Sequence, residues 1–394
     1  MSFATESGPE NVVTIKVVGV GGAGNNVVNR MVKSGTQGIE YVAVNTDKQA
    51  LAVSSADQKI QIGEKLTHGQ GAGSDPDVGK RSAEESRNNI AKSLENADMV
   101  FITAGMGGGT GTGAAPTIAD IAREAGILTV GVVTKPFKFE GKRRMDQAMV
   151  GINELLGKVD SLLIIPNDRL KFATDQKVTL ANAFEIADDV LRQAVVSISD
   201  LIKNTGFIHL DFADVTCVMK DAGFAHMGVG RAAGKGKAED AARMAVASPL
   251  METSINGARG VLINITGSED MGLEDVETAA NLVQEAAHPD ANIIFGASFD
   301  PSLDDEIRVS VIATGFDEPG KAQAEAAPAA AAAPAAAPAA GMYTAAATAA
   351  TAAPAAAPAP AAAPAAPAAA PAADAAAPAE EDPFDSIFKI FNSK

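Results

Sequence analysis

Short apolar segments alternate with longer helical patterns along residues 12–166, and this alternation constrains the fold more than any other feature of the sequence. The segments are VVTIKVVGV, YVAVN, KIQI, MVFITA, ILTVGVV and SLLIIP, most of them apolar on both faces and rich in β-branched residues. Strands of this kind, separated by helices, are typical of a parallel sheet covered on both sides. We therefore predict a doubly wound, mostly parallel α/β domain, in which ligands bind at the carboxyl ends of the strands.

A second, smaller α/β domain is predicted after a long central helix. Apolar side chains recur at 3.6-residue spacing over residues 178–203, which predicts the helix. The segments HLDFADVTCVM, GVLINITG, ANIIFGAS and IRVSVIATG follow it as predicted strands, with helical patterns at 236–247 and 272–287. We expect a flexible N-terminus at 1–11, a ligand-binding domain at 12–177, the central helix at 178–203 and the second domain at 204–317.

The end of the chain has a different composition. Between residues 321 and 380, 39 of 60 residues are alanine and 10 are proline. Alanine buries little surface and closely spaced prolines stop helices, so residues 318–380 are expected to form a disordered linker. In the closing segment 381–394, Phe384, Ile387, Phe388 and Phe391 follow helical spacing and make an apolar face too small to bury itself. An apolar face that cannot be buried within its own segment predicts that residues 381–394 form a partner-binding peptide.

The charge balance limits the classes of partner. The chain has 32 Lys and Arg against 49 Asp and Glu, a formal net charge of −17. This argues against general binding to nucleic acid or to an anionic membrane, which requires clustered cations. The first ten residues lack the pattern of a signal peptide, and the apolar runs are far shorter than the ~18 residues of a membrane span. We expect a cytoplasmic protein; its single cysteine, Cys217, alternates with buried strand positions and is predicted to lie in the core.

A glycine loop directly follows the first predicted strand. GVGGAGNN at 19–26 matches the GxGxxG dinucleotide fingerprint and precedes a helical pattern that begins near Asn26. Glycines let the backbone approach a phosphate, and free amides at a helix start face the anion. Because Asp47 closes the second strand, an NAD-dependent oxidoreductase is one interpretation. A tight strand-to-helix turn without a ligand is another.

A second glycine loop, GMGGGTGTG at 105–113, has six glycines in nine residues. The sequence offers no packing reason for this composition, and each glycine in a structured element costs about 0.5–1 kcal/mol of backbone entropy. Backbone amides exposed around an anion would explain it. A helix predicted from Ala114 to Glu124 would add its positive N-terminal dipole. Two such loops at neighbouring strand ends favour a ligand with a chain of phosphates.

GGGTGTG at 107–113 resembles the signature of the tubulin/FtsZ superfamily, and further segments resemble its FtsZ family of bacterial cell-division GTPases. These are TKPFKFEGKRR (134–144), PNDRL (166–170), LDFADV (210–215), SPLMETSINGARGVLINITG (248–267) and FGASFDPSLDDEIRVSVIATG (295–315). The resemblance implies binding of GTP and GDP, hydrolysis of GTP with Mg²⁺ bound mainly through the phosphates, and head-to-tail homopolymeric filaments. It further implies a division ring at midcell.

The resemblance also implies which residues surround the nucleotide. Around the phosphates it places Gly22, Ala23, Gly24, Asn25, Asn26, Gly107, Gly108, Gly109, Thr110 and Gly111, with Gly71, Ala72 and Gly73 toward the γ-phosphate. It places Glu140 and Arg144 near the ribose and phosphates, and Asn167, Phe184 and Asp188 at the nucleobase.

Two of these assignments have a simpler explanation in the sequence itself. Glu140 and Arg144 are four residues apart, a spacing that equally suits an ordinary ion pair on a helix surface. Asn167 follows an apolar strand, where polar side chains lie at the ligand edge of the sheet, but Asn is also a common turn residue. Both explanations stay open for each.

Asp188 would select the base. It lies one helical turn after Phe184, so the two side chains share one patch. A carboxylate can accept two hydrogen bonds from guanine and repels the edge of adenine, which lacks those donors. Arg192 lies four residues further on and could instead simply pair with Asp188.

By the same resemblance, Asp211 and Asp214 are the catalytic residues, which orient or deprotonate the attacking water. The helix from Asp188 to Lys203 covers about 22 Å, so these acids need not reach the nucleotide of their own chain. They would then complete the site of the next subunit in a filament. The family usually has Asn where this chain has His209, whose titration near about pH 6.5 could make hydrolysis pH-dependent. An exposed histidine without a role in hydrolysis is the other interpretation.

Three functions from different classes stay open on the sequence. They are an assembling GTPase, an NAD-dependent oxidoreductase, and a tubulin-like structural protein that binds nucleotide without turnover. A dehydrogenase would not need the second glycine loop, and we find no convincing group of hydride-transfer residues. The resemblance also implies that the peptide 384–394 docks on membrane-tethering division proteins, although it lacks the central sequence usual in the family.

Overall fold

The computed structural model describes residues 13–36, 38–172, 178, 179, 182–203, 208, 210–251, 255–268, 270–300 and 303–316. All of them belong to one compact unit. The predicted N-terminus at 1–11, the linker at 318–380, the peptide at 381–394 and His209 lie outside the described residues.

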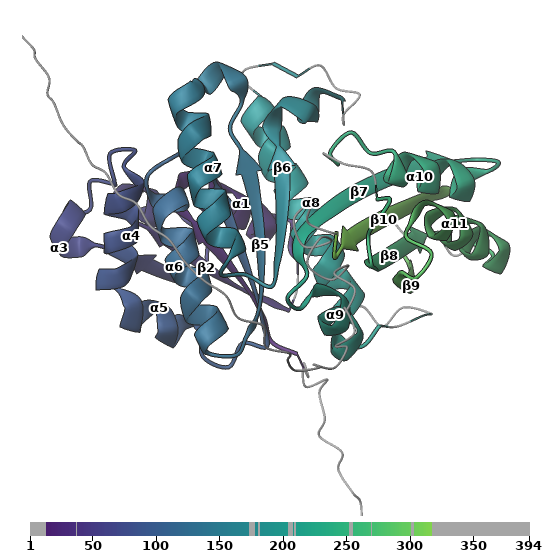
Figure 1. The fold of residues 1–394 in the computed structure, drawn as a ribbon, viewed down its shortest axis with the longest axis horizontal. Helices are drawn as coiled ribbons and strands as arrows, with labels where there is room; N and C mark the ends of the chain where they lie inside the picture. Colours follow the sequence, from purple (N-terminus) through teal and green to yellow (C-terminus); the bar gives the residue numbers. More distant parts are fainter. Residues whose placement is uncertain are drawn as a thin grey trace, which may run out of the picture. The chain divides into compact units, whose positions relative to one another are not determined.

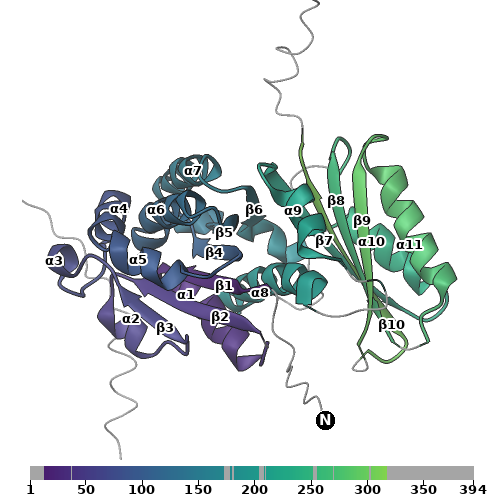
Figure 2. The same cartoon turned by 90° about the horizontal axis from the view of Figure 1, so that it is seen from below.

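One ten-stranded sheet runs through this unit in the order β3-β2-β1-β4-β5-β6-β7-β10-β8-β9, and its strands can be followed in Figure 1 and Figure 2 together. The six strands from β3 to β6 are all parallel. They are β1 (Ile15–Val20), β2 (Ile39–Asn45), β3 (Gln58–Gln61), β4 (Met99–Gly105), β5 (Leu128–Lys135) and β6 (Ser161–Pro166). The prediction of a doubly wound parallel sheet is confirmed.

Helices cover both faces of this parallel half (Figure 2). One face carries α1 (Gly21–Lys33), α2 (Lys48–Ala52) and α8 (Ala183–Lys203), and the other carries α4 (Pro76–Glu85), α5 (Arg87–Leu94), α6 (Thr110–Glu124) and α7 (Lys142–Leu156). In β1, Ile15 and Val17 pack into one core while Val18 and Val20 pack into the other. This two-sided burial explains why the strand is apolar except at Lys16.

The second half of the sheet is mixed. Strand β10 (Glu306–Thr314) lies antiparallel between β7 (Gly223–Ala233) and β8 (Gly260–Gly267), and β9 (Asn292–Phe299) extends the sheet parallel to β8. Strands β6 and β7 pair in parallel and join the two halves. Helices α10 (Lys237–Val246) and α11 (Leu273–Ala286) share a separate apolar core with these strands, as expected for a second α/β domain.

The segment HLDFADVTCVM is not a strand, so that prediction was wrong. Residues Phe212–Met219 form helix α9, which begins with a capping box in which Asp211 and Asp214 each accept a hydrogen bond from the other's backbone N–H. Val215 and Val218 are buried three residues apart, which is helical spacing. Cys217 lies between them on the exposed face of α9 and is not in the core.

Strand β7 was not predicted, and its glycines explain why. A Cβ on Gly228 would lie 1.9 Å from the carbonyl oxygen of Ala245, and one on Gly230 would lie 1.9 Å from that of Ala241. The strand needs glycine there because α10 packs directly against its backbone. Glycine weakens the local signal for a strand, so only the packing identifies it.

Helix α8 begins at Ala183, later than the predicted residue 178. Val178 and Thr179 are described but are not part of the helix. The side-chain oxygen of Asn182 accepts hydrogen bonds from the backbone N–H of Thr179 at 2.7 Å and from its hydroxyl at 3.0 Å. The backbone N–H of Asn182 donates in turn to the hydroxyl of Thr179 at 3.4 Å, so the two residues bond reciprocally in the manner of a capping box.

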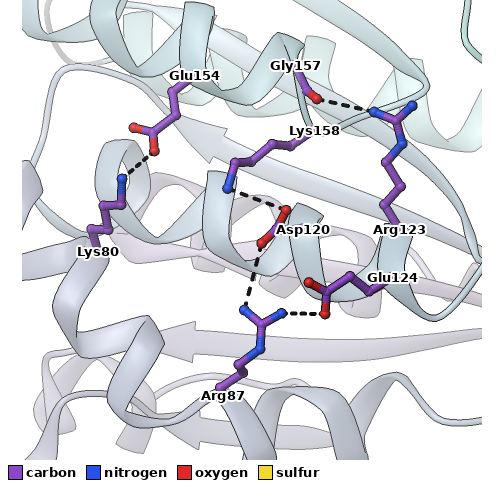
Figure 3. A network of polar contacts seen from close by, with 8 residues as sticks. All are labelled: Lys80, Arg87, Asp120, Arg123, Glu124, Glu154, Gly157 and Lys158. Carbon is purple, nitrogen blue, oxygen red and sulfur yellow. Dashed lines mark hydrogen bonds and ion pairs between the residues drawn. The ribbon is translucent and has the colours of Figure 1, made fainter.

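Helix α6, which carries the second glycine loop at its start, is held on its outer side by a polar network (Figure 3). Oδ2 of Asp120 in α6 lies 3.8 Å from Nη1 of Arg87, and Oδ1 of Asp120 lies 3.5 Å from Nζ of Lys158. Arg123 donates to the carbonyl oxygen of Gly157 at 3.2 Å. Exposed ion pairs contribute only about 0–1 kcal/mol each, so this network links α6 to α5 and to the end of α7 but adds little to the stability of the fold.

Candidate nucleotide-binding site

The two glycine loops meet where the strand order reverses. Strand β1 pairs with β2 on one side and with β4 on the other, and Val20 at the end of β1 lies opposite Ala104 near the end of β4. Ligands of open parallel sheets bind in this crevice, at the carboxyl ends of the strands. The loops that follow β1 and β4 are therefore neighbours at the expected ligand edge.

The first glycine loop forms the opening turn of α1. The helix begins at Gly21, earlier than the predicted start near Asn26. Gly21 has φ of +72°, and a Cβ on it would lie 2.9 Å from the backbone nitrogen of Gly111 in the second loop. A Cβ on Gly24 would lie 2.3 Å from the carbonyl oxygen of Thr103 in β4. Gly21 thus lets the two loops touch, and Gly24 lets α1 pack against the sheet.

Packing does require several glycines of the second loop, contrary to the expectation from the sequence. Gly107 has φ of +96°, and a Cβ there would lie 2.6 Å from the carbonyl oxygen of Arg144. A Cβ on Gly109 would lie 2.9 Å from the backbone nitrogen of Asp75. Around Gly108 a Cβ would meet nothing within 4 Å. The composition of this loop therefore serves close backbone packing as well as any ligand.

A cavity of about 230 Å³ opens over both loops. Eleven of the predicted nucleotide-binding residues line it: Gly22, Ala23, Gly108, Gly109, Thr110, Gly111, Glu140, Arg144, Asn167, Phe184 and Asp188. The sequence interpretation missed seven others: Val20, Gly21, Gly105, Met106, Thr134, Pro136 and Ala187. Most of these follow directly from the ends of β1, β4 and β5, so their position at the carboxyl edge was the signal that could have found them.

A second cavity of about 540 Å³ adjoins the first and shares Glu140 and Arg144 with it. Gly73 and Gly107 also line it, together with Ser74, Asp75, Arg143 and Gln147. Gly24, Asn25, Asn26, Gly71 and Ala72, which were also predicted to surround the phosphates, line neither of these two cavities.

Asn25 supports the first glycine loop through hydrogen bonds to its backbone. Its side chain is buried, with 3% of its surface exposed. With its amide oriented to suit its neighbours, its nitrogen donates to the carbonyl oxygens of Gly19 at 2.7 Å and Gly21 at 3.3 Å, and its oxygen accepts from Asn45 at 3.1 Å. Asn25 therefore acts on the shape of the loop, and Asn26 beside it is exposed.

Glu140 and Arg144 form the ion pair that their spacing suggested, and they also line the cavity. Arg144 Nε lies 3.1 Å from Glu140 Oε2, and the other oxygen of Glu140 accepts from the backbone N–H of Phe137 at 2.8 Å. Their role as a surface pair and their place at the cavity are therefore compatible. The pairing holds the Arg144 guanidinium between the two cavities.

Two buried polar groups face the cavity from its far side. Asn167 begins the 3₁₀ turn after β6 and is 5% exposed, and its side-chain oxygen has no hydrogen-bond partner among the described residues. Such an orphaned buried acceptor costs free energy unless a ligand satisfies it. Asp188 of α8 is 7% exposed, and burial raises the pKa of its carboxyl to about 6, while Arg30 of α1 opposes the shift.

Three phenylalanines stand beside these polar groups. Phe184 lines the cavity and is 46% exposed. The ring of buried Phe137 meets it edge-on at 5.6 Å and stacks with Phe139 at 5.1 Å. An exposed aromatic ring next to a buried carboxylate and an orphaned amide provides a stacking face and polar contacts for a planar base.

The predicted catalytic acids do not lie at this cavity. Asp211 and Asp214 line neither of the two cavities, and each accepts a hydrogen bond in the capping box of α9, at 2.8 Å and 3.4 Å. Both residues therefore have a structural role at the N-terminus of α9. In the part of the chain that the structure describes, no three His, Cys, Asp or Glu side chains come together to hold a metal.

No helix within the described ranges has the length and apolarity that crossing a bilayer requires.

Residues 14–175 match the family model of the Tubulin/FtsZ family GTPase domain, and residues 223–317 match that of the FtsZ family C-terminal domain. The oxidoreductase interpretation finds no support in these matches.

Solved structures agree with the family models. The empty FtsZ dimer of M. jannaschii is 45% identical in sequence, with a TM-score of 0.74 over 77% of this chain and 88% of that chain. The GDP-bound CetZ1 monomer of Haloferax volcanii is 20% identical, with a TM-score of 0.66 over 79% of this chain and 97% of that chain, and so shares the fold. With two family models matched in order and this level of identity to an FtsZ, the chain belongs to the tubulin/FtsZ family of GTPases.

Proposed function

We propose that this protein is a cytoplasmic GTPase that assembles head-to-tail into the filaments of the division ring at midcell, and that the next subunit completes each active site. The observation that carries the proposal is the meeting of both glycine loops, Asn167 and Asp188 around one cavity. The alternative from the same family, a structural protein that binds nucleotide without turnover, is separated from it by the experiment below.

The phosphates would lie over the two loops. The first turns of α1 and α6 offer backbone N–H groups with the positive end of each helix dipole, which favours an anion. Arg144 borders both cavities, and Arg143 lines the larger one, in which the γ-phosphate would lie beside Gly73. The net charge of the chain is negative, so these local groups must supply the attraction.

The nucleobase would lie against Phe184, with its polar edge toward Asp188 and Asn167. An ionised Asp188 accepts hydrogen bonds from the two adjacent donors of guanine and has no such partner on adenine. A donor from the base would also satisfy the orphaned side-chain oxygen of Asn167. Guanine is therefore the base that this arrangement fits.

Hydrolysis would require a second subunit, because Asp211 and Asp214 lie outside both cavities of their own chain. Solved relatives include an empty FtsZ dimer and a GTPγS-bound protofilament of CetZ2, which supports self-association of this chain too. An interface of this head-to-tail type repeats along an open filament. The carboxylates would orient or deprotonate the attacking water across it.

The residues at the cavity fit a magnesium ion held mainly by the nucleotide. The cavity offers N–H groups and the Thr110 hydroxyl, while its carboxylates are engaged, Glu140 with Arg144 and Asp188 with Arg30. Phosphate oxygens and water would then be the main ligands, which suits Mg²⁺ because this ion keeps several waters and is seldom bound by protein groups alone. When bound, the ion neutralises charge on the phosphates.

We further propose that the peptide 384–394 docks on membrane-tethering division proteins. Its four apolar residues at helical spacing are the support for this, and the Ala/Pro linker would give them reach from the filament.

Light scattering and phosphate release, measured in parallel with GTP, GDP and ATP over a range of protein concentrations, test the proposal. We expect scattering and hydrolysis with GTP alone, and a rate per subunit that rises steeply above a threshold concentration. A rate per subunit that stays constant on dilution would contradict the shared site. Scattering with GTP but no phosphate release would identify the structural protein without turnover.

A further inference from the structure

Thr46, the residue after β2, contacts two loops of the candidate site without lining either cavity. It is completely buried, at 0% exposure, and its hydroxyl lies 2.7 Å from the hydroxyl of Thr110, the first residue of α6. Its carbonyl oxygen accepts from the backbone N–H of Gly71 and from the hydroxyl of Thr67, both at 3.3 Å. One residue thus touches both the second glycine loop and the segment that leads to Gly73.

The direction of the Thr46–Thr110 hydrogen bond decides what Thr110 can do. A hydroxyl has one hydrogen to donate. If Thr46 donates to Thr110, the hydrogen of Thr110 is free to point into the cavity that Thr110 lines. If Thr110 donates to Thr46 instead, it presents only lone pairs to that cavity. An anion over the loop stabilises the first arrangement, and accepting a bond makes Thr110 a better donor in turn.

We propose that Thr46 is a positioning residue for phosphate binding, which donates its hydroxyl hydrogen to Thr110 so that Thr110 donates to a phosphate oxygen. This inference rests on the proposed function, because the acceptor is a phosphate of the bound nucleotide. Thr46 acts through Thr110 and does not touch the ligand itself.

The neighbouring residue, Asn45, extends the same arrangement to the first loop. The Asn45 side chain donates to Asn25, whose nitrogen holds the carbonyl oxygens of Gly19 and Gly21. The two residues at the end of β2 therefore contact all three segments expected at the phosphates. Their place in one short segment explains how the loops keep a common geometry.

The chain offers a matched control in Thr103 of β4. Like Thr46 it is a threonine at 0% exposure near the carboxyl edge of the sheet, but within the described part of the chain its hydroxyl has no hydrogen-bond partner. Replacing Thr103 by Val removes an equally buried hydroxyl that is not connected to Thr110. Replacing Thr46 by Ser keeps the hydroxyl that the proposal requires.

The test compares the binding of GDP and of guanosine, which lacks phosphates, by calorimetry. Thr46→Val should weaken GDP binding about 2- to 10-fold, the effect of one hydrogen bond between uncharged groups, because the hydroxyl that orients Thr110 is lost, and should leave guanosine binding unchanged. Thr46→Ser should restore GDP binding, and Thr103→Val should match the parent for both ligands. Thermal unfolding verifies that each variant folds, and Thr46→Ala replaces the valine variant if that one does not.

A double-mutant cycle with Thr110→Val then tests whether Thr46 acts through Thr110. The loss of GDP affinity from Thr46→Val should largely disappear in the Thr110→Val background. Full additivity would overturn the proposal, as would equal losses of GDP and guanosine affinity, which indicate a merely structural role. If the parent binds GDP and Thr46→Val binds it equally well, the inference alone fails. If the parent binds no guanine nucleotide, the proposed function fails first and the inference with it.

Discussion

Arg30 of α1 and Asp188 of α8 form an ion pair, with Nε of the arginine 3.5 Å from Oδ2 of the carboxylate. The sequence spacing had suggested Arg192 as the partner of Asp188. Arg192 instead pairs with Asp189 at 2.8 Å, and Asp188 lines the cavity. A cation from a different helix therefore helps to keep a buried carboxylate charged at the place where a base would bind. This arrangement has consequences for binding, for stability and for pH dependence.

The first prediction concerns Asp188→Asn. The amide keeps the shape of the side chain but has one acceptor oxygen and one NH₂ donor in place of two acceptor oxygens, so binding of GDP should weaken by about 10- to 100-fold and discrimination against other bases should relax. Nucleotide titrations with GDP, ADP and IDP measure both effects. Unchanged preference for guanine would show that Asp188 only pairs with Arg30.

The same substitution should stabilise the nucleotide-free protein. Burial raises the pKa of Asp188 from 3.8 to about 6, so at neutral pH the folded state carries a charge that is easier to hold in the unfolded chain. Removing that charge should increase the free energy of unfolding by about 1 kcal/mol or more at pH 7. Urea unfolding of the two proteins without nucleotide measures the difference, and a less stable variant would contradict the prediction.

Affinity for guanine nucleotides should depend on pH through Asp188. Because its pKa in the folded protein is about 6, the carboxylate that accepts from guanine is lost as the pH falls from 7 to 5. Stability has the opposite sign: between pH 3.8 and about 6 the folded state binds the extra proton, so the stability due to this group decreases as the pH rises through that range. GDP titrations from pH 5 to 7.5 should show the loss of affinity in the parent and a flatter profile in Asp188→Asn.

Two glycines of the first loop should respond differently to alanine. Gly24→Ala brings a methyl group to within 2.3 Å of the carbonyl oxygen of Thr103, which should cost about 1–3 kcal/mol of folding stability. A Cβ on Gly22, which lines the cavity, would meet nothing within 4 Å. Gly22→Ala should therefore leave the stability of the fold nearly unchanged while it weakens nucleotide binding. Urea unfolding combined with GDP titration separates the two effects, and equal loss of stability in both variants would refute the distinction.

Asp211 and Asp214 require variants that separate catalysis from helix capping. Asn caps a helix as well as Asp does, whereas Ala costs about 1 kcal/mol. Asp211→Asn should therefore keep the stability of α9, yet both Asp211→Asn and Asp211→Ala should lose turnover by about 10²-fold or more. Binding of GTP should stay close to that of the parent, and filaments should persist longer. Normal turnover in Asp211→Asn would show that the acid only caps the helix.

Mixing variants tests whether the acids act on the neighbouring subunit. Gly109→Asp should abolish GTP binding, since a Cβ at that position already lies 2.9 Å from the backbone nitrogen of Asp75. Added to Asp211→Ala, it supplies intact acids to a subunit that holds GTP, so phosphate release should recover in part. No recovery in a mixture that demonstrably co-assembles would argue for acids that act within their own chain.

Removal of residues 319–394 should leave GTP binding, hydrolysis and assembly largely intact. All residues that line the two cavities, and both acids of α9, precede this segment. Light scattering and phosphate release of the truncated chain, beside those of the full chain, test this. Loss of nucleotide binding on truncation would refute the division of the chain into a globular part and a tail.

The sequence was sufficient for those features that depend on neighbouring residues. Strands buried on both faces are mostly apolar along their length, as in β1 and β4, and this pattern predicts the parallel sheet and its ligand edge. The glycine loops follow the same strands directly. Local signals failed where packing between distant residues decides, as in β7, whose glycines accommodate α10, and in α9, where Asp211 and Asp214 cap a helix whose β-branched residues suggest a strand.

The sequence by itself thus determined the fold class and the edge of the sheet at which both glycine loops lie, because each follows from the pattern within one strand or loop. Most of the predicted residues that line the cavity came from the resemblance to a known family. Only the tertiary structure decided which partners those residues have. It pairs Arg30 with Asp188, places Asn25 behind the first loop and joins Thr46 to Thr110. These contacts join residues up to 158 positions apart, as 188 − 30 shows for the first pair, and no local pattern encodes a contact that forms only when separate elements pack together.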